Sequence, residues 1–359
     1  MLHRRRALLV ALAGSLSLGG VVSVVNAGPV SATHTAVSAP TPTARPVAAA
    51  ACTPGVSYGE PLRAVEQRAT MISGGFNFLE GPVWIAEQNR LLVSDMQPAA
   101  GTEKVQPSVI RAMTPAGAFS VFAGNAGSNG LARSADGTRL LAATHDQRNV
   151  SSFDLTGGDR RVEAATLRVG TPASPRNLRF NSPNDLTVRS DGTVYFTDPN
   201  FQRGNRRDDM SGRTGVYRVR DRVVYPVDET LRQPNGIVLS PDEKTLYVGA
   251  NGKIYRYPVL PDGRTGPRAD FAEVAGTDGA TVDCAGNIYW ASYSDGRIHV
   301  FAPDGRKRGT IIAGTNTTNA AFGGADGRTL FITSGVVMPN APGNFAVYQI
   351  YLNVPGSPY

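Results

Sequence analysis

Short apolar runs recur along the chain at a nearly constant spacing. Six of them begin at Leu91, Leu140, Val194, Leu246, Ile288 and Leu330. Their starts are separated by 49, 54, 52, 42 and 42 residues, and most follow a turn-type sequence such as ADGT or SDGT. Short runs rich in β-branched and aromatic residues, bounded by Gly, Asp or Asn, predict β-strands. No convincing amphipathic helix of about 10 or more residues follows residue 60, which disfavours an alternating βαβ fold.

A second strand-like segment follows several of these runs, for example GVYRV at 215–219 and KIYRYPV at 253–259. A period of about 40 to 50 residues, with about four strands in each unit, is typical of a β-propeller. The sequence therefore predicts an all-β fold, a six-bladed β-propeller over residues 56–359. A β-sandwich is the structural alternative, but it does not explain the register of polar residues described next.

A polar side chain stands 10 or 11 residues before each apolar run. The six residues are carboxylates or amides, and each is followed by Gly, Asp or Ala and then by an apolar segment. They are Glu80, Asn129, Asn184, Asn235, Asp278 and Asn319. Equivalent positions of a radial repeat converge on its axis, so these residues should open the innermost strands at the mouth of a central channel. One Asn-Gly pair would indicate only a turn, whereas six polar residues at nearly the same offset favour a binding site.

Carboxylate and amide oxygens are the ligands that hard divalent cations prefer. We expect Glu80, Asn184, Asn235 and Asp278 to bind such a cation, with Ca²⁺ preferred and Mg²⁺, Mn²⁺ or Zn²⁺ as alternatives. The two acids would neutralise its charge, and the two Asn would add neutral oxygens. The alternative interpretation is that each polar residue only satisfies a backbone group where its strand begins.

Three stretches around these residues carry a family resemblance. FLEGPVW, RFNSPNDLTVRSDGTVYFTDP and QPNGIVLSPDEKTLYV resemble the gluconolactonase, senescence marker protein and luciferin-regenerating enzyme family, over about residues 70–351. The resemblance implies a six-bladed propeller with a divalent cation in its channel and an activity that opens lactone rings. It also implies that Glu80 and Asn235 are metal ligands, that Asn184 contacts metal or substrate, and that Asp278 is both a ligand and the catalytic group.

Four further residues are candidates for substrate binding. Asn129 holds the register position of the second unit, and Asp185 follows Asn184, where it could orient a water or a ligand. His145 lies in ATHDQRNV, which resembles a neighbouring family motif, and Arg179 precedes FNSPND. An ordinary surface position is the alternative for Arg179, because Arg is rarely buried unless it is paired.

The expected chemistry is hydrolysis of a sugar lactone, with the carbonyl polarised by the metal and Asp278 acting as general base or as nucleophile. Two other functions stay open: an aryl-ester or organophosphate hydrolase on the same site, and a non-enzymatic propeller binding module with a structural cation. The acid pair Glu80 and Asp278 favours an enzyme. A Ser-His-Asp hydrolase is disfavoured because no nucleophile elbow is present.

The N-terminal 27 residues have the features of a signal peptide. A basic start, Arg4 to Arg6, precedes an apolar segment at 7–25, and Val25-Asn26-Ala27 fits a cleavage site. An uncleaved membrane anchor is the alternative, and the partial twin-arginine pattern leaves the export route open. We expect a secreted, extracellular protein.

Residues 28–55 are rich in Ala, Pro, Thr and Ser, which predicts a disordered linker. Cys52 ends this tract, and Cys284 is the only other cysteine. After export the two could form a disulfide, or they could remain two thiols.

Charge narrows the choice of partner. The net charge of +7 falls to +4 once residues 1–27, which hold three Arg and no acid, are removed. The remaining Lys and Arg are scattered and form no basic stripe, so nucleic acid is not expected as a partner. We expect a small lactone or ester as the substrate and no stable membrane partner, and the sequence predicts no oligomeric state.

Overall fold

The computed structural model describes residues 52–53, 55–114, 117–336 and 344–358. Every described residue belongs to the unit formed by residues 45–359. The expected signal peptide (1–27) lies outside the described residues, and so does the expected linker (28–55) apart from Cys52, Thr53 and Gly55. Within the described part, no helix is both long and apolar enough to cross a bilayer.

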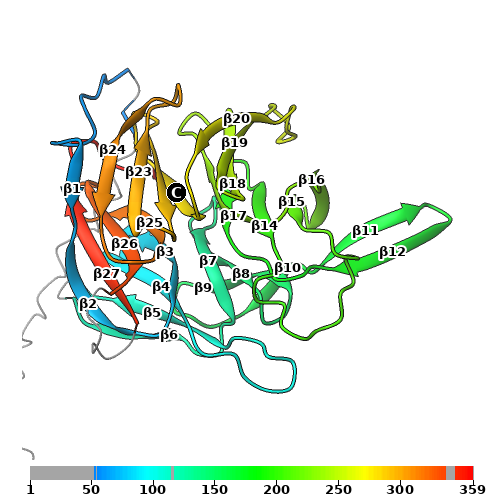
Figure 1. Cartoon of the computed structure of the whole chain (residues 1–359). Coiled ribbons are helices and arrows are strands. Elements are labelled where there is room, and N and C mark those ends of the chain that lie inside the picture. Colours follow the sequence, from blue (N-terminus) through cyan, green and yellow to red (C-terminus); the bar gives the residue numbers. More distant parts are fainter. Residues whose placement is uncertain (1–51, 54, 115–116, 337–343, 359) are drawn as a thin grey trace, which may run out of the picture. The chain divides into compact units, whose positions relative to one another are not determined.

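Six sheets of mainly antiparallel strands succeed one another along the described chain and confirm the predicted six-bladed propeller (Figure 1). We number the sheets as blades 1 to 6. In blades 1 to 4, four strands pair in the order of the sequence. A three-residue 3₁₀ helix, η1 (Ala86–Gln88), connects the first two strands of blade 1. The strands of these blades are β3 (Leu79–Ile85), β4 (Arg90–Met96), β5 (Ser108–Met113) and β6 (Phe119–Ala123); β7 (Ser128–Arg133), β8 (Arg139–Thr144), β9 (Asn149–Asp154) and β10 (Arg161–Ala164); β13 (Leu186–Val188), β14 (Val194–Asp198), β15 (Gly215–Arg220) and β16 (Val223–Asp228); and β17 (Pro234–Leu239), β18 (Thr245–Ala250), β19 (Lys253–Pro258) and β20 (Ala269–Glu273).

Blades 5 and 6 each add a strand from the start of the folded body. Blade 5 consists of β21 (Thr277–Val282), β22 (Ile288–Ser292), β23 (Arg297–Phe301) and β24 (Lys307–Ile312), with β1 (Glu66–Arg68) parallel to β24. Blade 6 consists of β25 (Thr317–Gly323), β26 (Thr329–Gly335) and β27 (Phe345–Tyr351), and β2 (Thr70–Phe76) is its outermost strand. The two ends of the described body therefore meet in one sheet, which closes the ring.

The first strand of each blade is its innermost strand. The inner strands β3, β7, β13, β17, β21 and β25 contact one another in sequence order, and β25 contacts β3 to complete the cycle. The six apolar runs form the next strand outward in each blade, namely β4, β8, β14, β18, β22 and β26, and each begins within one residue of its predicted start. These second strands are almost wholly buried, because both of their faces pack against neighbouring blades.

Aromatic pairs join neighbouring blades. Trp84 of blade 1 stacks on Phe331 of blade 6 with ring centroids 5.5 Å apart. Tyr289 of blade 5 meets Phe322 of blade 6 edge to face at 5.1 Å. Such pairs contribute about 0.5–1.5 kcal/mol each beyond the burial of their apolar area. Together with the aliphatic side chains between the sheets, they fix how closely the inner strands approach one another.

One hairpin lies outside the repeat. Strands β11 (Thr166–Thr171) and β12 (Ser174–Arg179) pair only with each other and extend away from the blades (Figure 1). Most of the hairpin is exposed, but Leu167 and Leu178 near its base are buried in the apolar cluster shared by blades 2 and 3. The hairpin is thus anchored at its base by two Leu side chains.

A disulfide connects Cys52 to Cys284, with Cα atoms 5.2 Å apart and a sequence separation of 232 residues. This resolves the choice that the sequence left open. Cys284 lies in the turn between β21 and β22, and its backbone N–H donates to the carbonyl of Pro355 at 2.8 Å. The disulfide therefore ties the start of the described chain to the region where the chain ends.

Breaking the disulfide is expected to lower the free energy of unfolding by about 2–5 kcal/mol, because the cross-link closes a long loop of the unfolded chain. Cys52→Ser, Cys284→Ser and the double variant should lose the same amount, since each removes the same bond. Thermal unfolding with and without a reducing agent measures this, and the reductant should affect only the wild type. Single variants as stable as the oxidised wild type would contradict the prediction.

Candidate functional site

The polar residues of the sequence register stand where the inner strands begin. Five are the second or third residue of β3, β7, β17, β21 and β25, and Asn184 comes two residues before β13. Asn235 is partly buried, and the other five are less than 6% exposed. The structure thus places six carboxylate and amide side chains at one level of the ring of inner strands.

Glycine follows four of these residues because the inner strands almost touch at this level. A Cβ atom on Gly236 would lie 2.1 Å from the carbonyl oxygen of Asp278, and one on Gly279 would lie 2.0 Å from Cγ of Asn319. Gly81 and Gly130 face the neighbouring strand just as closely. No side chain fits in these places, so the repeated Asn-Gly and Asp-Gly pairs reflect strand crowding around the channel rather than ordinary turns.

Blade 3 has Asp185 where four other blades have glycine. Its carboxylate accepts hydrogen bonds from the backbone N–H of Leu186 at 2.9 Å and from Nδ2 of Asn319 at 3.5 Å. Asn319 belongs to blade 6, which is three places from blade 3 in the cycle of six. Asp185 and Asn319 therefore meet across the channel from opposite blades, and we call this contact the crossbar.

Three acidic side chains share this buried space. Burial, then the charge of Asp185, raises the pKa of Glu80 to about 8. Burial raises the pKa of Asp185 to about 7. The pKa of Asp278 is raised well above its usual value by burial first and then by the charges of Glu80 and Asp185. Without a cation, the close carboxylates disfavour one another's charge and retain protons near neutral pH.

Hydrogen bonds connect the acids to the neighbouring amides. Asn235 donates to Asp278, and Asn319 donates to both Glu80 and Asp185. Two buried atoms at this level have no hydrogen-bond partner among the described residues, Oδ1 of Asp278 and Nδ2 of Asn129. Buried polar atoms without partners are uncommon and cost free energy, so they mark the places where a ligand or an ion fits.

The described residues contain no group of three or more His, Cys, Asp or Glu side chains arranged to hold a metal ion. A cation here would use a mixed set, the carboxylates of Glu80 and Asp278 with the amides of Asn184 and Asn235. Two observations show that this set fits a hard cation. Asp278 has a buried oxygen without a hydrogen-bond partner among the described residues, and the acids repel one another, a repulsion that a divalent ion would relieve.

His145 and Arg179 lie among a different group of residues. His145 is fully buried, its Nε2 donates to the carbonyl of Gln106 at 2.8 Å, and burial lowers its pKa to about 4. Arg179 is exposed at the end of β12 and donates to the carbonyl of Gln147 at 3.3 Å. In this arrangement His145 is a neutral donor that holds the segment around Gln106 in place.

Two arginines that the sequence did not single out support the loop at 199–214. Arg148 donates to the carbonyls of Phe180, Arg179 and Arg207, and Arg206 donates to the carbonyls of His145 and Asp146 and to two carbonyls of its own loop. Both guanidinium groups are largely buried. They are occupied by backbone carbonyls, so they hold the loop and are not free to bind a substrate.

Tyr293 is a further residue at the channel mouth that the sequence did not reveal. It directly follows β22, and its backbone N–H donates to the carbonyl of Gly276, two residues before Asp278, at 2.9 Å. The side chain is 40% exposed, and burial, then the charges of Asp278 and Glu80, raises its pKa. An exposed aromatic ring beside the acid pair is a suitable contact for a small molecule that enters the channel.

The fold and the polar ring define a six-bladed propeller with an acidic centre. Residues 78–336 match the family described as the SMP-30/gluconolactonase/LRE-like region. The chain belongs to this family, as its sequence motifs indicated.

Similar proteins agree with this assignment. The gluconolactonase of Zymomonas mobilis is 33% identical over 293 residues, which cover 74% of this chain and 78% of that protein. A solved gluconolactonase structure from Xanthomonas campestris is 28% identical, covers 83% of this chain and 91% of that one, and has a TM-score of 0.63. The calcium-binding protein regucalcin from Agrobacterium tumefaciens is 18% identical, with 82% and 96% coverage and a TM-score of 0.63, and shows the shared fold.

Proposed function

We propose that the protein is an exported, metal-dependent lactonase that opens the ring of a sugar lactone. The named relatives support the reaction class, since the protein 33% identical to this chain is a gluconolactonase. The observation that carries the proposal is the free, buried Oδ1 of Asp278 beside Glu80 in the ring of inner strands. A binding module with no reaction to perform has no evident need for two acids that repel each other there.

The proposed cation is divalent, with Ca²⁺ preferred and Mg²⁺, Mn²⁺ or Zn²⁺ as alternatives. Glu80, Asn184, Asn235 and Asp278 would hold it. When bound, such an ion supplies Lewis-acid polarisation of the lactone carbonyl and keeps the acids ionised. Glu80 contributes charge, and Asn319 holds its carboxylate in place by a hydrogen bond. Asn129, whose Nδ2 is free, donates a hydrogen bond to the substrate.

Asp278 performs the proton transfers in this proposal. Its Oδ1 takes a proton from water as the water oxygen bonds to the acyl carbon. The acyl carbon–ring oxygen bond then breaks, and Asp278 returns the proton to the ring oxygen, which yields the open hydroxy acid. Attack by Asp278 itself, through an acyl-enzyme, is the second route. A rapid loss of lactone equal to the enzyme concentration, ahead of release of the hydroxy acid, would identify that second route, because the ring oxygen stays tethered to the acyl group and acylation alone frees no product.

Chelation tests the proposal directly. Protein treated with a chelator and then dialysed should hydrolyse gluconolactone no faster than buffer in a pH-stat, and Ca²⁺, Mg²⁺, Mn²⁺ or Zn²⁺ should restore turnover. The reason is that the carboxylates regain protons once the cation is removed. Full turnover by the chelated protein would exclude the metal dependence. No turnover with any cation, on any lactone tested, would exclude the lactonase itself.

Calcium binding is expected to release protons at pH 7 and to tighten as the pH rises from 6 to 8. In the metal-free protein the pKa of Glu80 is about 8 and that of Asp185 about 7, so carboxylates of the ring are partly protonated there and must lose protons as the cation binds. Calorimetric titration in two buffers of different ionisation enthalpy counts the protons. Equal heats in both buffers would contradict the prediction, and Glu80→Gln should lower the count.

Export is the remaining part of the proposal. The pattern of residues 1–27 supports it, and so does the disulfide, because such bonds persist mainly in oxidising compartments. The intact mass of protein recovered from culture medium tests it, since cleavage after Ala27 leaves Gly28 as the first residue. Retention of the full-length chain inside the cell would contradict export.

A further inference from the structure

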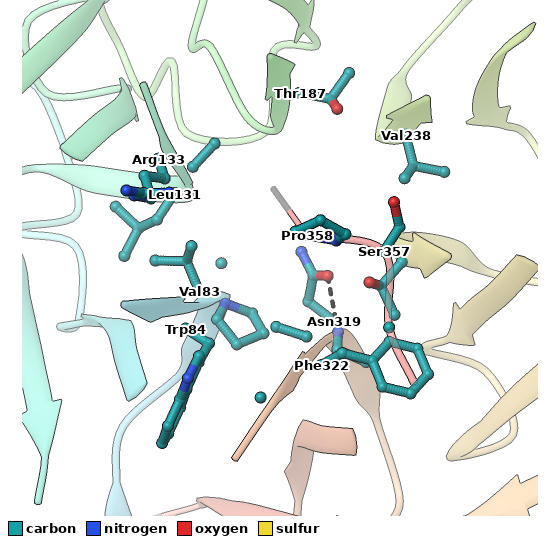
Figure 2. Close-up of a pocket in the computed structure, with 18 of the residues that line it drawn as sticks. Val83, Trp84, Leu131, Arg133, Thr187, Val238, Asn319, Phe322, Ser357 and Pro358 are labelled. Atoms are coloured by element: carbon teal, nitrogen blue, oxygen red, sulfur yellow. Dashed lines mark hydrogen bonds between the residues drawn. The ribbon is translucent and has the colours of Figure 1, made fainter. Parts of the chain in front are cut away.

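A cavity lies in the channel beyond the polar ring. Its volume is about 140 Å³, and all six inner strands line it with residues one to four positions after the polar one. Figure 2 shows Val83, Leu131, Thr187 and Val238 around a common space, with Pro358 and Asn319 near its centre in that view. We call this cavity the chamber.

The crossbar separates the chamber from the acidic site. Asp185 and Asn319 touch at 3.5 Å from opposite blades, and both also line the chamber. Around them the inner strands are in van der Waals contact, since Gly130 faces the Asp185 side chain and Gly279 faces Asn319 with no room for a Cβ atom. A molecule larger than water cannot pass from one space to the other without displacing these side chains.

The other end of the chamber is bounded by the last described residues. The N–H groups of Gly356 and Ser357 donate to the carbonyls of Gly327 at 2.8 Å and Val282 at 3.0 Å, so this segment is held against blades 5 and 6. Beside it, Glu87 and Arg133 form an ion pair with side chains 41% and 27% exposed. Their exposure marks the rim through which solvent reaches the chamber, and their pairing leaves no net charge there.

The chemistry of the walls indicates what the chamber can hold. Val83, Leu131, Ile237, Val238 and Phe322 make the walls largely apolar. Two buried polar atoms of the lining have no hydrogen-bond partner among the described residues: Oγ1 of Thr187, which is 3% exposed, and Nε of Arg133 at the rim. The carboxylate of Asp185, in contrast, already faces the N–H groups of Leu186 and Ile237 and the amide of Asn319.

We propose that the chamber is a second binding site, for a small uncharged molecule with an apolar body and one hydroxyl or carbonyl group that bonds to Thr187. Predominantly apolar walls with a few well-placed polar groups are typical of sites for such ligands. The volume sets the size, because an engineered apolar cavity of ~150 Å³ admits benzene. The Thr187 hydroxyl distinguishes the chamber from a purely apolar cavity. The proposal does not depend on the lactonase activity.

Matched fluorinated probes test the proposal by ¹⁹F NMR titration of the full protein. We expect 4-fluorophenol to bind more tightly than fluorobenzene, by on the order of fivefold, through its hydrogen bond to Thr187. The anion 4-fluorobenzoate should not bind, because Arg133, the cationic residue of the lining, is already paired with Glu87. Failure of both neutral probes to bind, or binding of the anion at the same site, would overturn the proposal.

Two variants locate the binding. Thr187→Val keeps the shape of the side chain and removes only the hydroxyl, so it should abolish the preference for 4-fluorophenol while fluorobenzene still binds. Ala280→Leu adds bulk at a partly exposed position in the chamber wall and should weaken the binding of both probes. Melting curves and the affinity of Thr187→Val for fluorobenzene show whether the variants are folded. An unchanged preference in a folded Thr187→Val protein would assign the binding to another place.

Discussion

Replacing Asp278 by Asn is expected to reduce lactone turnover by about 10²–10⁴-fold, which is the usual contribution of a general base. Asn has nearly the same shape as Asp, but it cannot accept the proton of the attacking water. It also removes one of the two proposed ligand charges, so the assay needs saturating Ca²⁺ to separate lost binding from lost chemistry. The value of kcat in a pH-stat, corrected for spontaneous opening of the lactone, is the measurement.

Asp295→Asn is the matched control. Asp295 belongs to the same blade, in the turn between β22 and β23, and its side chain is 41% exposed beside His299. This variant should turn over like the wild type. The Asp278→Asn protein should melt no lower than the metal-free wild type, since it lacks a buried charge that Glu80 and Asp185 oppose. Wild-type turnover by Asp278→Asn would remove Asp278 from the mechanism.

Gly236→Ala is expected to lower the free energy of unfolding by about 3 kcal/mol, at the upper end of the usual cost of overpacking. The new Cβ atom would lie 2.1 Å from the carbonyl oxygen of Asp278 and 2.9 Å from Cα of Gly279. Both contacts are with backbone, so no side chain can rotate away, and blades 4 and 5 must separate at the ring. Denaturant unfolding of the wild type and the variant measures the loss.

Gly124→Ala is the comparison for this experiment. Gly124 has an ordinary backbone conformation, and no atom lies within 4 Å of the place its Cβ would take. Replacing it should leave stability unchanged or raise it by about 0.4–1 kcal/mol, because alanine restricts the unfolded chain. Equal stability of the two variants would show that the inner strands are less crowded than the structure indicates.

The repeat made much of this architecture predictable. A blade has a nearly fixed length, so the spacing of the apolar runs indicated six units, and the constant offset placed Glu80, Asn184 and Asp278 at equivalent positions. The same regularity indicated that the segment before each run is the innermost strand. These inferences succeeded because each depends on a local pattern that recurs.

Features that join distant or non-repeated parts of the chain were not predictable. The offset of a residue from its apolar run predicts how deep in the channel the residue lies, but not which residue it contacts. The contact between Asp185 and Asn319 therefore did not follow from the sequence. The burial of His145 depends on Gln106, in a loop with no repeat counterpart. The β11–β12 hairpin and the pairing of β2 with β27 likewise fall outside the period.

The closing of blade 6 by β2 has a consequence for how the protein is made. Strand β2 is synthesised long before its partner β27, because the strands of the other blades lie between them in the sequence. The ring therefore cannot close before β27 has been made, and the pairing that closes it bridges nearly the whole body, which makes it one of the slower folding steps. Until that pairing forms, the blades lack the contact that holds them as a closed ring, so the stability of the whole body depends on two strands that lie far apart in the sequence.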